Sequence, residues 1–495
     1  MNNYLQIHAA DNVAVALADL APETEIAIPD NRFRLCDAIP KGHKFSIRPI
    51  KNGENVIKYG SPIGHATQPI GQGCHVHTHN LATNLSGTLH YEYNPEFPEI
   101  TVPDETPVFN GYCRKNGDVG IRNELWVVPT VGCVNGIAGQ MVKLFKERFR
   151  HDEIDAIEVF SHNYGCSQLG GDHANTRRVL ANLATHPNAG GVLVLGLGCE
   201  NNQISALIPE IGLYDPERVR FLVAQESEDE IEEGVSLLAS LYNAMKNDRR
   251  EPVPLSKLKV GLKCGGSDGF SGITANPLLG MFSDYLTALG GTTILTEVPE
   301  MFGAEHLLMQ RAENRLIFDQ TVRLVNDFKD YFLKHEQPVY ENPSPGNKAG
   351  GITTLEEKSL GCTQKGGLSK VTGVLEYGEM VSRPGLNLLS APGNDLVATS
   401  ALGFSGCQLA LFTTGRGTPF GSFIPTVKIS TNSELASRKK NWIDFDAGTL
   451  LLGAGSQAVL KKFVEYIISV ANGEKVNHEK NGFKEIAIFK SGVTL

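Results

Sequence analysis

The chain has 495 residues, of which 41% are hydrophobic and 20% are charged, and its formal net charge is −10. This composition is typical of a globular protein, and the length predicts two to four domains because a single core rarely grows beyond about 300 residues. The net negative charge argues against a general nucleic-acid-binding protein, which would carry a basic patch or stripe. No apolar stretch is long enough to span a membrane, and no signal peptide is evident after Met1.

Residues 1–92 are predicted to form a small, mostly β domain. Their apolar segments are short, and turn signals such as Lys41-Gly42 and Asn52-Gly53 separate them. Residues 93–108 contain four prolines, at positions 95, 98, 103 and 107. That is too many for a helix or a central strand, so this segment is predicted to be a linker.

From residue 109 onward, apolar runs alternate with helical patterns, which predicts Rossmann-like α/β domains with mostly parallel sheets. A polar stretch near residues 245–259 is a plausible boundary, so the α/β part divides into domains at 109–252 and 253–495. Residues 335–362 read as one long loop, and a loop of that length inside a compact domain is usually functional or disordered. Asn347, Lys348 and paired glycines favour a functional loop.

Three Gly-Cys pairs follow apolar runs at a constant interval. Cys133, Cys166 and Cys199 are spaced so that 166 − 133 and 199 − 166 are both 33, and Cys264 ends a further run. The carboxyl ends of parallel strands gather at one edge of a sheet, where ligands bind. Thiolates suit iron, so these cysteines predict a mononuclear iron or an iron–sulfur site. The alternative is that they are small residues in tight strand-to-helix turns.

A second candidate metal site is the run of His75, His77 and His79. On a strand, alternate residues point to the same face, so three imidazoles would lie side by side and offer an alternative metal site. A solvated edge strand is the competing interpretation. The nine cysteines form no C-x-x-C pair, and reduced thiols are typical of a cytoplasmic protein.

Several polar turns after apolar runs carry acid, base or anion-binding groups. Arg416 in GRGTP can hold a carboxylate through two hydrogen bonds, and Asp268, Glu297 and Glu300 are candidate acid or base carboxylates. Each carboxylate alone is more often a helix cap or a turn former. The G-x-G-x-x-G spacing is absent, which argues against a nicotinamide-dependent dehydrogenase.

Taken together, these motifs resemble the altronate/galactarate dehydratase family. The resemblance covers nearly the whole chain, from HAADNVAVAL, KGHK and HVHTHN through NGDVGIRNELW, SHNYGCSQ and GLGCENN to CGGSDGFSGITANP, NPSPGNKAGG, TTGRGTP and AIFKSGVTL. It implies an N-terminal SAF-type, β-clip-like domain followed by the two further domains of this family. It also implies an iron-dependent hydro-lyase that converts D-altronate into 2-dehydro-3-deoxy-D-gluconate in hexuronate breakdown. Alternatives are another sugar acid such as galactarate, or an iron- or redox-sensing protein without turnover.

The motif positions supply the candidate site residues. We expect His43, Lys44 and Asp268 to be catalytic, and Cys133, Cys166, Cys199 and Cys264 to bind Fe²⁺, with His75, His77 and His79 as the alternative ligands. The substrate-binding candidates are His8, Asp11, Asn12, Arg122, Asn123, Lys348 and Arg416. The expected partner is a small sugar acid, and binding to nucleic acid or to a membrane is not expected. The protein is expected to be a cytoplasmic enzyme and a possible homo-oligomer.

Overall fold

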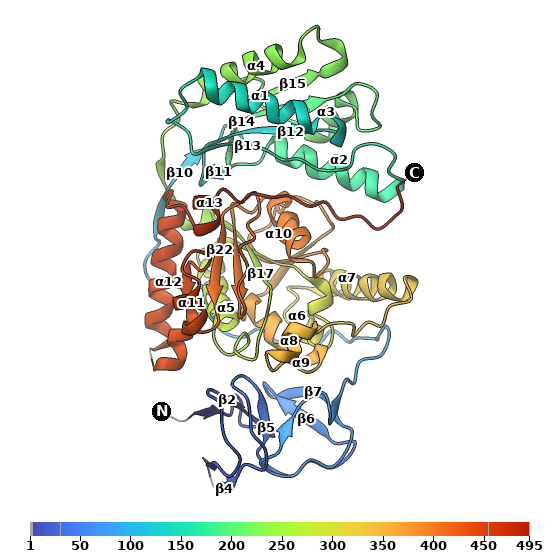
Figure 1. The fold of residues 1–495 in the computed structure, drawn as a ribbon, viewed down its shortest axis with the longest axis vertical. Coiled ribbons are helices and arrows are strands. Elements are labelled where there is room, and N and C mark those ends of the chain that lie inside the picture. The colour runs from blue at the N-terminus through green and yellow to red at the C-terminus, as the bar shows by residue number, and fades with distance from the viewer. Residues whose placement is uncertain (1–2, 30, 454, 495) are drawn as a thin grey trace.

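The computed structural model describes residues 3–29, 31–453 and 455–494, and it stacks three domains along its long axis (Figure 1). The N-terminal domain lies at one end and the second domain, coloured cyan to green, lies at the other. The C-terminal domain lies between them, although it comes last in the sequence. It therefore contacts both of the others.

The N-terminal domain is built from short antiparallel strands. One sheet has the order β1-β2-β5-β8, a second is the pair β3-β4, and a third has the order β6-β7-β9. Val13, Val56 and Ile63 are fully buried between these sheets. The strands are β1 (Tyr4–Leu5), β2 (Val13–Ala16), β3 (Glu25–Ile28), β4 (Asn31–Arg34), β5 (Lys44–Ser46), β6 (Asn55–Lys58), β7 (Ser61–Ala66), β8 (His75–Val76) and β9 (Leu81–Ala82).

The connection to the second domain runs along the C-terminal domain without regular structure. Its Tyr93 hydroxyl donates a hydrogen bond of 3.0 Å to the carbonyl of Ala312, and the amide of Glu96 donates to that of Gln310. It ends at a small antiparallel sheet in which β10 (Val108–Cys113) pairs with β11 (Val119–Gly120) and β16 (Glu251–Pro254). This sheet joins the second and C-terminal domains because β16 leads directly into the latter.

The second domain is a parallel sheet of order β13-β12-β14-β15 covered by helices on both faces. Along β12, Leu125 and Val127 pack with α1 and α4, while Trp126 and Val128 pack with α2 and α3. This alternation follows the two-residue period of a strand. The elements are β12 (Glu124–Pro129), η1 (Gly132–Val134), α1 (Asn135–Arg148), β13 (Ala156–Val159), α2 (Gly170–Ala184), β14 (Ala189–Gly196), α3 (Ile204–Ile211), β15 (Val219–Val223), η2 (Ala224–Glu226) and α4 (Glu230–Met245).

The C-terminal domain is a seven-stranded parallel sheet of order β19-β20-β18-β17-β21-β22-β23. Its strands are β17 (Lys259–Cys264), β18 (Thr292–Leu295), β19 (Val371–Leu375), β20 (Gly385–Leu389), β21 (Leu409–Thr414), β22 (Thr426–Ser430) and β23 (Phe445–Asp446). Its helices and 3-10 turns are η3 (Leu255–Lys257), α5 (Ala275–Ala288), η4 (Val298–Glu300), α6 (Glu305–Met309), α7 (Arg315–Lys334), α8 (Pro345–Ala349), α9 (Leu355–Thr363), η5 (Gln364–Gly366), α10 (Asp395–Phe404), α11 (Ser433–Arg438), η6 (Ala447–Leu452), α12 (Ser456–Ala471) and α13 (Asn477–Lys480).

The fold class predicted from the sequence is confirmed: a small antiparallel β domain precedes α/β domains with parallel sheets. One detail is wrong, because residues 335–362 are not a single long loop. They contain α8 and most of α9, and every residue of α9 is buried. Its charged residues Glu356, Glu357 and Lys358 are buried along with its apolar ones, so no apolar stripe alternates with a solvent-facing polar one, and the periodic pattern of an amphipathic helix is missing. Among the described residues, no helix is long and apolar enough to cross a membrane.

Candidate active site

The richest group of polar side chains lies where the strands of the seven-stranded sheet end. The turns after β17, β18, β20, β21 and β22 carry Asp268, Glu297, Asp395, Arg416 and Asn432. This is the sheet edge at which open α/β folds bind ligands. The N-terminal domain covers part of this edge, since the Gly42 backbone lies against Gly269 and Gly351.

A cavity of about 290 Å³ opens between the two domains. Three cationic side chains line it: Lys41 from the N-terminal domain, Arg416 after β21, and Arg438 at the end of α11. Asp268, Asn432 and Glu434 complete its polar wall, and the Glu434 carboxylate pairs with the Lys41 ammonium at 3.1 Å. Guanidinium groups bind carboxylates through paired hydrogen bonds, so this cavity suits a small organic acid.

Asp268 is the half-buried carboxylate of the cavity. It accepts hydrogen bonds from the Thr431 hydroxyl at 3.0 Å and from the Phe270 amide at 3.1 Å. Burial raises the pKa of Asp268, although these hydrogen bonds work in the opposite direction. A carboxyl group tuned in this way can exchange a proton closer to neutral pH than an exposed aspartate.

Four histidine side chains gather beside the cavity, on the N-terminal domain. His43 Nδ1 lies 3.1 Å from His75 Nε2, and the ring centroids of His43 and His77 are 4.9 Å apart. The His79 ring lies tilted against that of His75, with centroids 5.6 Å apart. The arrangement is not the predicted strand face, because β8 ends at Val76 and His77 begins a turn. The turn nevertheless brings the rings together.

These histidines also contact the segment that lines the cavity. His77 Nε2 lies 2.9 Å from the Lys348 carbonyl, and His43 Nε2 lies 3.3 Å from the Ala349 carbonyl. Burial lowers the pKa of His43, and burial together with the neighbouring positive groups lowers the pKa values of His75 and His77 to about 4. The three imidazoles are therefore neutral at pH 7, the form that binds metals.

Lys44, predicted to be catalytic, lies in a closed ion-pair group. Its ammonium contacts Glu357 at 2.8 Å and Lys58 contacts the other oxygen of the same carboxylate at 2.7 Å, and all three side chains are 1% exposed. Burial lowers the pKa of Lys44 to about 8, while the ion pair with Glu357 outweighs burial and raises the pKa of Lys58. Lys44 fastens the N-terminal domain to α9 and is closed off from the cavity wall.

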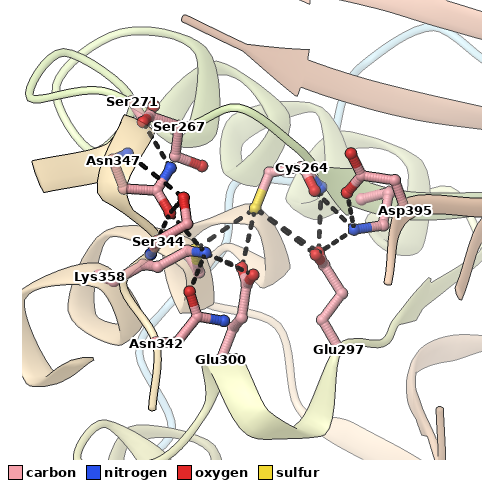
Figure 2. Close-up of polar contacts among 12 residues, drawn as sticks. Cys264, Ser267, Ser271, Glu297, Glu300, Asn342, Ser344, Asn347, Lys358 and Asp395 are labelled. Carbon is pink, nitrogen blue, oxygen red and sulfur yellow. Dashed lines mark hydrogen bonds and ion pairs between the residues drawn. The ribbon is translucent and has the colours of Figure 1, made fainter. Parts of the chain in front are cut away.

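A second buried network lies behind the cavity (Figure 2). Lys358 contacts Glu300 at 2.7 Å and Asn342 at 3.0 Å, and its ammonium also lies 3.3 Å from Asn347. Asn347 in turn donates to the carbonyl of Ser267, one residue before Asp268. The network therefore supports the wall of the cavity from within.

Cys264, predicted to be an iron ligand, belongs to this network. Its sulfur lies 3.4 Å from that of Cys362 and 3.2 Å from a Glu300 oxygen, and these three are the described residues whose potential metal-ligand atoms all meet within 4.8 Å. The Lys365 ammonium donates to the Cys264 sulfur at 2.8 Å and also pairs with Glu297. Two ammonium groups contact these donor atoms, Lys365 on Cys264 and Lys358 on Glu300, so a metal ion bound here would have to displace them.

Cys133, Cys166 and Cys199 lie on a different sheet from Cys264, because their strands belong to the second domain. The three are exposed, whereas Cys264 is buried. The predicted set of four thiolate ligands is therefore wrong as a set. The sequence pattern places each cysteine correctly at a strand end, but it does not distinguish one sheet from two.

Arg122 and Asn123 do not bind substrate in this structure. The Arg122 guanidinium is fully buried and forms two hydrogen bonds of 2.8 Å with Glu479, which ties the second domain to α13. The Asn123 side chain bonds to the Met245 carbonyl and to Arg114. Both predictions are corrected to structural roles.

His8, Asp11 and Asn12 shape one turn of the N-terminal domain. Asp11 accepts from the amides of His8 and Gly60, and Asn12 bonds to the backbone of Asn55 and Ile57. Their hydrogen-bonding capacity is used locally, and none of the three lines the cavity. Their substrate-binding role therefore remains a prediction.

Some residues of the site were not singled out from the sequence. Lys41 lies two positions before His43 in the KGHK motif, so that motif carried the signal. Arg438 lies in SELASRKKN, where nothing distinguishes it from the other cations of an exposed helix. Glu357 and Lys358 lie in a charged stretch that reads as solvated.

Comparison with known families covers each of the three domains. Residues 2–84 match the altronate/galactarate dehydratase SAF domain, residues 111–246 match the second domain of D-galactarate dehydratase/altronate hydrolase, and residues 255–494 match the D-galactarate/altronate dehydratase C-terminal domain.

Three relatives match over almost their whole length. The chain is 59% identical to an altronate dehydratase of Escherichia coli, over 99% of this chain and 100% of the relative. It is 58% identical to an altronate dehydratase of Bacillus subtilis, over 100% of both chains. A galactarate dehydratase (L-threo-forming) of Escherichia coli is 33% identical over 95% of this chain and 93% of the relative. The chain therefore belongs to the altronate/galactarate dehydratase family.

Proposed function

We propose that the protein is a hydro-lyase that removes water from D-altronate to give 2-dehydro-3-deoxy-D-gluconate. The observation that carries this proposal is the identity of 58–59% over the full chain to two altronate dehydratases, against 33% to a galactarate dehydratase. The cation-lined cavity at the sheet edge provides the binding chemistry that a sugar acid needs.

Substrate binding in this proposal begins with the carboxylate. Arg416 and Arg438 hold it in the cavity, with the Lys41 ammonium alongside. Their positive charge also stabilises the negative charge that develops on the carboxylate when the neighbouring carbon loses its proton. The hydroxyl groups of the sugar chain face Asp268 and Asn432.

Two proton transfers complete the dehydration. A base removes the weakly acidic C2 proton, and an acid gives a proton to the C3 hydroxyl, which leaves as water. The resulting enol regains a proton at C3 as it becomes the 2-keto acid. His43 is the proposed base, because its lowered pKa keeps the imidazole neutral, and Asp268 is the proposed acid, because its raised pKa favours holding a proton.

An iron cofactor is part of the proposal. The imidazoles of His75, His77 and His79 are the proposed ligands, with the His75 ring 5.4 Å from that of His77 and 5.6 Å from that of His79 beside the cavity, which leaves His43 to act as the base. Their nitrogens do not all meet within 4.8 Å in this structure, so the rings would have to turn to bind one ion. Bound iron supplies a Lewis acid for an oxygen atom of the substrate. The proposed site of action is the cytoplasm, the compartment in which thiols and ferrous iron stay reduced.

The test is turnover of D-altronate by protein purified and assayed without oxygen, with Fe²⁺ and a thiol, scored as 2-keto-3-deoxy acid formed. We expect rapid product that disappears when a chelator is added, and much slower product from galactarate. Faster turnover of galactarate would replace the proposed substrate. No product from either acid would favour an iron- or redox-sensing protein without turnover.

A further inference from the structure

A second cluster of reactive side chains lies far along the chain from the cavity residues, at the carboxyl edge of the sheet in the second domain. Cys133 follows β12, Cys166 follows β13 and Cys199 follows β14. β12 is the parallel neighbour of both other strands, so the three strand ends lie side by side. All three thiols are exposed to solvent. The mechanism proposed above uses none of them.

The three turns that carry these thiols are hydrogen-bonded to one another. The Gly132 amide donates to the Tyr164 carbonyl, and the Asn202 amide donates to the Gly165 carbonyl, both at 3.0 Å. The buried Glu200 carboxylate accepts from the Thr130 hydroxyl at 2.6 Å and from the Gly198 amide at 2.6 Å. The cysteines are therefore held on one connected frame.

Glycine makes this frame possible at two of the three turns. Gly165 and Gly198, the residues before Cys166 and Cys199, have φ angles of +102° and +127°. A Cβ on Gly165 would overlap the carbonyl oxygen of Thr130. Both turns therefore depend on glycine, which adopts positive φ angles without strain.

The surroundings of the thiols favour a bulky, negatively charged group. The helices α1, α2 and α3 all begin just after the cysteine-bearing turns, and helix N-termini favour negative charge. Cβ atoms added at Gly136 and Gly139 on α1, or at Gly170 and Gly171 at the start of α2, would meet no atom within 4 Å. The edge is thus open, with small residues around it.

We propose that Cys133, Cys166 and Cys199 bind an iron–sulfur cluster of the [4Fe–4S] type, with one iron left without a protein ligand. The three sulfur atoms do not all lie within 4.8 Å of one another. A single metal ion with metal–sulfur bonds of about 2.3 Å can bridge sulfur atoms only up to roughly that spacing. In a cluster each thiolate binds a different iron, so the thiols stand farther apart. The proposal concerns this edge and is independent of the altronate reaction.

Cluster uptake is a ligand exchange. The three cysteine thiols replace three thiolate ligands of a preformed cluster, and each gives its proton to the ligand that leaves. Three iron–sulfur bonds form and three break, and no electron is transferred. The binding site therefore needs no oxidant or reductant for loading.

The test mixes the full-length protein, without oxygen, with a preformed [4Fe–4S] cluster ligated by 2-mercaptoethanol. After gel filtration, iron and acid-labile sulfide are measured per chain, and the electron paramagnetic resonance spectrum is recorded after reduction. We expect equal amounts of iron and sulfide, about four of each per chain, and a cluster signal. Protein that retains neither iron nor sulfide, or iron without sulfide, would overturn the proposal.

Matched variants locate the cluster. Cys133→Ser, Cys166→Ser and Cys199→Ser should each reduce retained iron and sulfide several-fold, while Cys36→Ser and Cys113→Ser, which alter exposed cysteines elsewhere, should retain wild-type amounts. Circular dichroism checks that each variant is folded. Wild-type retention in all three variants at the edge would overturn the assignment. The double variant His75→Gln/His77→Gln should keep the cluster, which separates this site from the proposed Fe²⁺ site.

Discussion

Arg416 is the side chain expected to contribute most to binding of the substrate carboxylate, since its guanidinium lines the cavity and donates only one hydrogen bond, at 3.3 Å, to Gly346. We predict that Arg416→Ala raises the KM for D-altronate by about 10- to 100-fold, the effect of losing hydrogen bonds to a charged group worth about 1.5–3 kcal/mol. Steady-state kinetics measures this. Arg383→Ala, on the exposed surface, should leave KM unchanged. Equal KM values for the two variants would remove Arg416 from the binding site.

Glu357 is the single counter-charge of Lys44 and Lys58. We predict that Glu357→Gln destabilises the protein by about 3–5 kcal/mol, because it leaves two buried ammonium groups without a counter-charge. Denaturation by urea, followed by circular dichroism, measures the change. Glu465→Gln on the exposed face of α12 is the control and should change stability by less than about 0.5 kcal/mol. An unchanged unfolding midpoint in Glu357→Gln would contradict the structural role assigned to this group.

The histidine cluster makes stability depend on pH. His75 and His77 have pKa values of about 4 in the folded protein against 6.5 when unfolded, so the unfolded chain binds more protons between these values. Stability should therefore fall as the pH drops from about 6.5 towards 4. His43, His79, Lys44 and Glu357 face the same cluster.

The measurement is the thermal midpoint at about pH 7, 6 and 5, compared between the wild type and His75→Gln/His77→Gln. The double variant should lose less stability on acidification. Other buried histidines, such as His186 and His478, are present in both proteins and cancel in the difference. Parallel curves for the two proteins would show that the cluster does not contribute.

At the scale of elements, the turn after β17 fixes how the N-terminal domain docks. Gly269 donates a hydrogen bond of 2.7 Å to Gly350, and a Cβ on Gly269 would overlap the Gly42 carbonyl. We predict that Gly269→Ala displaces the N-terminal domain and lowers turnover on the order of 10- to 100-fold, since small misplacements are costly in catalysis. Protease sensitivity near residues 94–107 should rise in parallel.

The control for this variant is Gly455→Ala, since a Cβ at Gly455 meets nothing within 4 Å. That variant should retain wild-type turnover and protease resistance. If Gly269→Ala also behaves like the wild type, close contact between the β17 turn and Gly42 does not position the cavity.

The elements that could be predicted from the sequence are those whose environment produces a pattern. The β12 run LWVVP is buried on both faces and reads as continuous apolar sequence, so its strand and the turn at Cys133 were predictable. The α9 sequence LEEKSLGCT reads as solvated, yet Glu356, Glu357 and Lys358 are all buried. Their stability in the interior comes from partners far along the chain, which no local pattern records.

The same distinction applies to the candidate site. Asp268 and Arg416 follow strands directly, so the rule for parallel sheets located them. Arg122 and Asn123 are polar residues of a family motif, so they are expected to bind substrate. Their hydrogen-bond partners Glu479 and Met245 lie 357 and 122 residues away along the chain. A motif indicates that a polar residue matters, whereas tertiary contacts decide whether it binds substrate or holds two domains together.

At the scale of the whole molecule, the cavity requires two domains that lie far apart along the chain, with the second domain between them in sequence. Lys41 and His43 come from the N-terminal domain, while Asp268 and Arg416 come from the C-terminal domain. We predict that residues 1–92 and 93–495, produced as separate chains, are inactive alone and regain turnover of D-altronate when mixed. Recovery should rise with the concentration of the smaller piece. Full activity of residues 93–495 alone would place the reaction elsewhere.

The stacking order of the domains also governs how the chain can be assembled during synthesis. Lys58 finds its buried partner Glu357 only 299 residues later. At about 5–20 residues per second, this delay is on the order of 15–60 s. The first domain to leave the ribosome must therefore keep two lysines hydrated while the second domain and the first part of the C-terminal domain are made, and it docks only when α9 emerges. The ion-pair group thus closes only after the first 357 residues of the nascent protein have been made.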